Sequence, residues 1–83
     1  MWNLGRIMQS QPLSEIHAGE TVRLVSINGG RKLARRLLSL GITPGAELEI
    51  LHRRGQGVVI GRNGNRVALG RGISEKLQAE KID

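Results

Sequence analysis

A short amphipathic helix with a sharply defined end is the feature of this chain that most restricts its fold. Residues 29–45 read Gly-Gly-Arg-Lys-Leu-Ala-Arg-Arg-Leu-Leu-Ser-Leu-Gly-Ile-Thr-Pro-Gly. At about 100° per residue, the cations of this segment fall on one arc of a helix and the apolar residues on the other. The cations are Arg31, Lys32, Arg35 and Arg36, and the apolar residues are Leu33, Ala34, Leu37, Leu38 and Leu40. The sequence therefore predicts one basic helix face and one core face, with both Leu37 and Leu38 in the core.

The end of this helix is marked twice. Gly41 can take the left-handed conformation that ends a helix, and Pro44 then forbids any continuation. We therefore expect about three helical turns.

Short apolar runs separated by glycine-containing turns predict strands over most of the remaining chain. The predicted strands are residues 21–27, 46–52, 58–60, 66–69 and the second half of 73–80, and residues 12–16 predict one helical turn. In the second strand, Leu48, Ile50 and His52 share one face by alternation. Asn63-Gly64 is a hairpin signal between the third and fourth strands. Leu77 and Ala79 are expected to point inward from the last strand.

About five short strands and one helix predict a mainly β fold, a small and partly open SH3-like barrel, because closing a sheet removes its exposed edges. The OB-fold has a similar inventory and is the alternative. We expect residues 1–11 to form a flexible tail and residues 12–83 the barrel domain. A chain of 83 residues lies near the lower size at which an apolar core alone stabilises a domain. That core must be aliphatic, because Trp2 is the only aromatic residue.

The charge of the chain is positive and unevenly placed. The formal net charge is +6, and residues 31–71 hold most of the cations with only Glu47 and Glu49 among them. No acid stands four residues before the helix arginines, where it could pair with them. The sequence therefore predicts an acidic partner for this face. The candidate partner-binding residues are Arg31, Lys32, Arg35 and Arg36, with Arg53 and Arg54 as a second basic edge.

Signals for catalysis or for a cofactor are absent from the sequence. There is no P-loop, no cysteine, and no recognisable Ser-His-Asp or paired-carboxylate arrangement. The only imidazoles are His17 and His52, whose spacing does not indicate a metal site. We therefore predict no catalytic, cofactor-binding or metal-binding residues. No apolar stretch approaches the ~20 residues of a membrane span, and we expect a cytoplasmic protein.

Four segments of the chain match the pattern of a known family. They are Leu13-Ser-Glu-Ile16, Gly19-Glu-Thr-Val22, Arg35-Arg-Leu-Leu-Ser-Leu-Gly-Ile-Thr-Pro-Gly45 and Asn65-Arg-Val-Ala-Leu69. They resemble the FeoA family, small cytosolic proteins of the bacterial ferrous iron transport system. The resemblance implies an SH3-like barrel and an accessory role to FeoB, a membrane iron transporter with a cytosolic GTP-binding domain. It also implies binding of ferrous iron or another transition metal ion, which the residues do not indicate by themselves.

The sequence and the resemblance together predict a non-enzymatic adaptor that docks on the cytosolic GTPase region of FeoB, modulates iron uptake, and meets the membrane only through that partner. The alternative is a small basic RNA-binding barrel. Against it, single-strand binders use aromatic stacking platforms, and the predicted barrel contains no aromatic residue. We therefore expect no nucleic acid partner.

Overall fold

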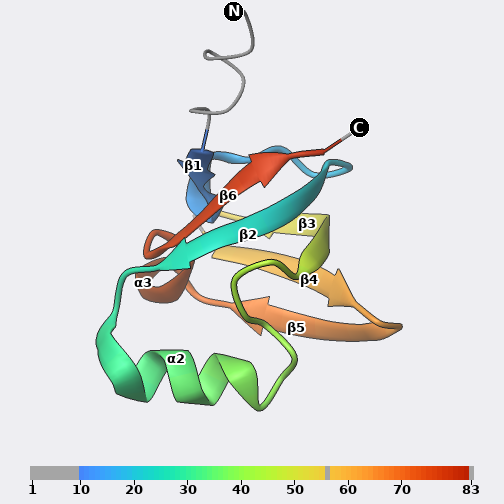
Figure 1. Ribbon diagram of the computed structural model, residues 1–83. Helices are drawn as coiled ribbons and strands as arrows, with labels where there is room; N and C mark the ends of the chain where they lie inside the picture. Colours follow the sequence, from blue (N-terminus) through green and yellow to red (C-terminus); the bar gives the residue numbers. More distant parts are fainter. Residues whose placement is uncertain (1–9, 56, 83) are drawn as a thin grey trace, which may run out of the picture.

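A bent antiparallel sheet forms the body of the molecule, and one helix lies at an end of it (Figure 1). The computed structural model describes residues 10–55 and 57–82, and within them the sheet has six strands in the order β1-β6-β2-β3-β4-β5. The elements are β1 (Ser10–Pro12), η1 (Leu13–Glu15), β2 (Thr21–Ile27), α2 (Gly30–Leu38), β3 (Glu47–Arg54), β4 (Gly57–Arg62), β5 (Asn65–Leu69), α3 (Arg71–Ser74) and β6 (Leu77–Lys81). The predicted mainly β architecture is confirmed. The helix α2 and the strand β1 lie at opposite ends of the molecule (Figure 1).

The first strand is the element that the sequence did not predict. Ser10 pairs with Glu80 and Gln11 with Ala79, which extends the sheet beyond β6. The sequence predicts both residues in the tail, and the structure has them in β1. Residues 1–9 of the predicted tail lie outside the described residues. A strand of three residues pairs with the edge of a sheet through backbone hydrogen bonds and does not need alternating apolar side chains. The sequence of β1 therefore does not predict a strand.

The core is aliphatic, as composition required. Inward-facing residues of the central strands fill it, and Leu77 and Ala79 are fully buried as predicted. Its members are Leu13, Ile16, Val22, Leu24, Leu37, Ile42, Ala46, Leu48, Ile50, Val58, Ile60, Leu69, Leu77 and Ala79. The helix contributes Leu37, so α2 is joined to the core through one fully buried side chain.

A bulge in β3 corrects the predicted position of His52. Ile50 faces Ile60 across the ladder, but His52 faces Val59, so β3 carries one extra residue there. A bulge of this kind reverses the alternation of side chains beyond it. His52 is therefore exposed rather than inward, and Arg53 takes the inward-facing register, opposite the buried Val58.

Candidate docking surface

Glycines fix both ends of the basic helix. Gly30 has φ +82° at its start, and a Cβ on the preceding Gly29 would collide with the side chain of Leu33. At the other end, the Ile42 amide donates to the Leu37 carbonyl over 2.9 Å and the Gly41 amide to the Leu38 carbonyl over 2.9 Å. With Gly41 at φ +81°, these two bonds form a Schellman cap. The predicted glycine stop is confirmed, and it fixes where the helix ends.

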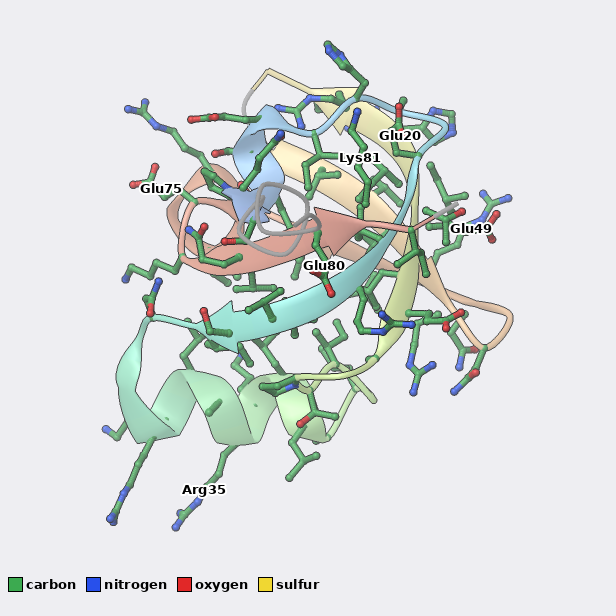
Figure 2. The ribbon with its side chains drawn as sticks, turned by 45° about the horizontal axis from the view of Figure 1, so that its top comes forward. Glu20, Arg35, Glu49, Glu75, Glu80 and Lys81 are labelled. Carbon is green, nitrogen blue, oxygen red and sulfur yellow. The ribbon has the colours of Figure 1, made fainter. Side chains whose placement is uncertain are left out.

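All four predicted cations of α2 are exposed, namely Arg31, Lys32, Arg35 and Arg36. Within the described residues the ion pairs join other cations to acids, in the pairs Arg23–Glu47, Arg23–Glu80, Arg71–Glu75 and Lys81–Glu20. Figure 2 shows Arg35 projecting from α2 away from the sheet, while the labelled Glu20, Glu49, Glu75 and Glu80 lie on the other side of α2, away from Arg35. The cations of α2 are thus available to a partner.

The structure divides these cations between two surface grooves, one on each side of α2. Arg31 and Arg35 line the first, the Arg31/Arg35 groove, which has a volume of about 220 Å³. Its other walls come from Ile27 of β2, Ala34 and Leu38 of α2, and the loop residues Thr43 and Pro44. Its floor is therefore mainly apolar.

Lys32 and Arg36 line the second groove, the Lys32/Arg36 groove, of about 450 Å³. Its opposite wall is built by residues near α3, among them Ile73 and Lys76. Lys76 adds a third cation to this groove that sequence reasoning missed, because it lies 40 residues after Arg36 in the chain and only the tertiary fold brings the two together.

Leu38 does not lie in the core, and the prediction that placed it there was wrong. Its side chain is 58% exposed, whereas that of Leu37 is 2% exposed. At about 100° per residue, Leu38 falls at the edge of the apolar arc next to Arg31, and no element covers it there. Leu40 is 47% exposed as well, so the basic surface carries large apolar side chains that a partner can bury.

Arg53 is engaged inside the protein rather than held free at a second basic edge. Its Nη1 donates to the Leu13 carbonyl over 2.9 Å and to the Ile16 carbonyl over 2.7 Å, and its Nη2 donates to the Ser14 carbonyl. Through these hydrogen bonds, Arg53 connects β3 to η1 and the residue that follows it. Arg54 is exposed and lines a different depression with Gly57 and Arg71, so the structure does not bring Arg53 and Arg54 into either groove of α2.

The described residues do not offer a metal-binding cluster. No three His, Asp or Glu side chains within residues 10–55 and 57–82 lie close enough together to hold a metal ion. Both His17 and His52 are exposed, so the residues present do not fit the transition metal site that the resemblance implies. In the same part of the chain, no helix is long and apolar enough to cross a membrane.

Comparisons with known proteins identify relatives along most of the chain. The model of the FeoA domain family matches residues 11–81. The putative Fe(2+) transport protein A of Methanocaldococcus jannaschii is 33% identical over 72 residues, which cover 87% of this chain and 88% of the relative. The matched region runs from β1 to β6 and includes α2 with both grooves.

Solved structures agree on the fold. A crystal structure of an iron uptake regulatory protein (FeoA) superposes with a TM-score of 0.80 at 33% identity, covering 90% of this chain and 100% of that one. The solution structure of the FeoA protein from Chlorobium tepidum superposes with a TM-score of 0.79 at 27% identity, covering 88% and 71%. These matches confirm the SH3-like prediction over the OB-fold alternative.

Proposed function

Because the chain belongs to the FeoA domain family, whose members are non-enzymatic accessory proteins associated with ferrous iron transport, we propose that it docks on the cytosolic GTPase region of a FeoB transporter and modulates it. The surface of α2 is the docking site. This role places the protein in the cytoplasm, in contact with the membrane only through its partner. Iron is the cargo of that transporter, and the adaptor acts on the transporter without holding the metal.

The observation that carries the proposal is the unpaired charge of α2. Four exposed cations share a helix of nine residues, and the ion pairs of the described residues involve none of them. Exposed charge of one sign raises the rate of association with an oppositely charged surface. Arg54 extends the basic surface but stands outside the two grooves, and Arg53 contributes to the fold.

The position of two of these cations is unfavourable for the isolated helix. Arg31 and Lys32 stand in the first turn, which contains no acid, and the positive end of the helix dipole repels cations there. Local choices that oppose stability are expected at functional sites. The first turn of α2 therefore fits a surface kept basic for a partner better than one optimised for folding.

A calorimetric titration against the cytosolic region of the cognate FeoB tests this function, with an unrelated RNA in parallel. Both ligands are measured at about 50 and 200 mM salt, the range over which phosphate-driven binding weakens steeply. Saturable one-to-one binding to the FeoB region at both salt concentrations, lost in the double variant Arg35→Glu/Arg36→Glu, is the expected result. Absence of that binding, with RNA binding that collapses at the higher salt, supports the RNA-binding alternative instead.

A further inference from the structure

The Arg31/Arg35 groove combines an apolar floor with a basic rim. Ile27, Ala34, Leu38 and Pro44 form the floor and come from β2, from α2 and from the loop that follows it. Leu38 is the most exposed large apolar side chain among the described residues, at 58%. Apolar surface left open inside a groove and edged by charge is typical of a protein-binding site.

The rim of this groove lacks its counter-charge. Arg31 and Arg35 are four residues apart and therefore lie on the same side of the helix. No described acid comes within ion-pair distance of either guanidinium. Because a guanidinium presents paired donors that match the two oxygens of a carboxylate, glutamate and aspartate are the complementary side chains.

The size of the groove indicates a side chain rather than a small molecule. Its volume of about 220 Å³ is below the ~300–1,000 Å³ of pockets that enclose drug-sized ligands. It suits one or two apolar side chains presented by a larger partner. An amphipathic helix delivers such side chains at spacings of three, four and seven residues, with its polar residues along the rim.

We propose that this groove receives an acidic amphipathic helix of the partner, which buries an apolar side chain against Leu38 and pairs its carboxylates with Arg31 and Arg35. The proposal rests on the docking function proposed above and names the chemistry of the docked segment.

Other occupants match this groove less well, either in charge or in apolar contact. The N-terminal segment of the chain, residues 1–9, contains Arg6 and no acid. A second copy offers few free acids: Glu20, Glu47, Glu75 and Glu80 each face a cation of their own, which leaves only Glu15 and Glu49 unpaired among the described acids. A nucleic acid would leave the apolar floor uncovered, because the described residues include no Phe, Tyr or Trp side chain on which a base could stack.

Two matched pairs of variants test the groove against the rest of the helix surface. Arg35→Glu and Arg36→Glu make the same change of charge on neighbouring residues, but only Arg35 lines the Arg31/Arg35 groove. Leu38→Ser and Leu40→Ser remove similar exposed side chains, and only Leu38 lines it. Circular dichroism first verifies that each variant is folded.

Calorimetry with the cytosolic FeoB region then measures the affinity of each variant. We expect Arg35→Glu and Leu38→Ser to weaken binding at least about tenfold. Arg36 and Leu40 belong to the docking surface but lie outside this groove, so Arg36→Glu and Leu40→Ser should each weaken binding by a clearly smaller factor, about threefold, because hot spots dominate interface energies. Equal effects within each pair would overturn the groove proposal while leaving docking on FeoB intact. Binding at least about tenfold tighter after removal of residues 1–9 would identify that segment as the occupant and overturn the proposal too.

A second probe decides the groove proposal if wild-type protein does not bind FeoB, an outcome that refutes the proposed function. The probe is a fluorescein-labelled synthetic helix of about 20 residues with leucines three, four and seven residues apart and glutamates beside them. A control peptide carries lysines in place of the glutamates. Anisotropy that rises with the acidic peptide and depends on Leu38 and Arg35, but not on Leu40 and Arg36, supports the groove. If the anisotropy does not rise, or rises equally with the Leu38→Ser variant, the groove proposal is overturned.

Discussion

At the scale of single residues, Arg53 illustrates how one side chain can connect distant parts of a small fold. Its guanidinium donates to the carbonyls of Leu13, Ser14 and Ile16, and Leu13 and Ile16 are core residues. A buried carbonyl without a donor is destabilising. Arg53 supplies donors to the Ser14 and Ile16 carbonyls and adds a second donor to the Leu13 carbonyl, which already accepts from the Ile16 amide. We infer that Arg53 serves stability before it serves binding.

Substitution of Arg53 should therefore weaken the fold more than substitution of its neighbour. Arg53→Met keeps most of the aliphatic stem but removes the donors, and we expect the free energy of unfolding to fall by about 1–3 kcal/mol. Arg54→Met is the control and should change it by less than about 0.5 kcal/mol, because Arg54 is exposed. Urea denaturation followed by circular dichroism measures both. Equal effects would mean that the three carbonyls do not depend on Arg53.

Adjacent leucines of α2 supply a second contrast at this scale. Leu37→Ala removes a side chain that is 2% exposed, and we expect the free energy of unfolding to fall by about 2–5 kcal/mol. Leu38→Ala removes one that is 58% exposed, and the loss should stay below about 0.5 kcal/mol. Thermal unfolding of the two variants compares them directly. A larger loss for Leu38→Ala would show that α2 is turned about its axis relative to the structure.

At the scale of elements, α2 is a helix whose ends are fixed by its neighbours rather than by its own charges. Glycines at both ends and the cap at Gly41 hold it in place, while its first turn contains cations and no acid. The dipole of the helix favours Arg35 and Arg36 in the last turn and disfavours Arg31 and Lys32 in the first. Helix stability thus favours acidic residues in the first turn, whereas docking on an acidic partner favours basic residues there.

A charge reversal in that first turn should separate these demands. Arg31→Glu places an acid at the positive end of the dipole and four residues before Arg35, so we expect the free energy of unfolding to rise by about 0.3–1 kcal/mol. The same variant should bind the cytosolic FeoB region more weakly. Arg35→Glu is the control, because it should weaken binding while lowering stability. Urea denaturation and calorimetry on both variants test this, and a less stable Arg31→Glu protein would contradict the electrostatic account of α2.

At the scale of the whole molecule, α2 holds the largest group of unpaired cations. Among the described residues, four of the exposed cations without an ion pair lie on α2, and Arg54, Arg66 and Lys76 lie elsewhere. The labelled acids lie away from α2, and Arg35 extends from α2 in the opposite direction (Figure 2). Ion pairs neutralise Arg23, Arg71 and Lys81, whereas α2 keeps its charge. Because α2 contributes the largest group of unpaired cations, we expect this side of the molecule to attract an acidic surface most strongly.

The sequence predicted most of this fold because its local signals agree with the tertiary structure. The strand at Thr21–Ile27 is observed with the predicted bounds, and Asn63 and Gly64 form the expected hairpin turn with positive φ angles of 53° and 82°. The prediction that His52 shares a face with Ile50 was wrong, because a bulge depends on the pairing with the partner strand and cannot be recognised in the sequence of β3 alone. Helical periodicity placed Leu38 on the apolar side but could not show where the sheet stops covering that side.

The candidate surface was predictable only in part for the same reason. Four cations on one helix follow from spacing alone, but their division between two grooves depends on what packs beside α2. Lys76 and Pro44 reach these grooves through the tertiary fold. The hydrogen bonds of Arg53 likewise join residues 37 to 40 positions apart, beyond the range of any local pattern.

The most direct test of the central claim, that α2 with its two grooves is the docking surface, is a map of amide chemical shifts. Uniformly ¹⁵N-labelled protein is titrated with the unlabelled cytosolic region of the cognate FeoB. The account predicts shift changes and line broadening concentrated in Gly30–Leu38, in the loop through Pro44 and around Lys76, with little change in β1 and at the β4–β5 turn. Changes centred on that turn or on β1, with α2 unaffected, would contradict it.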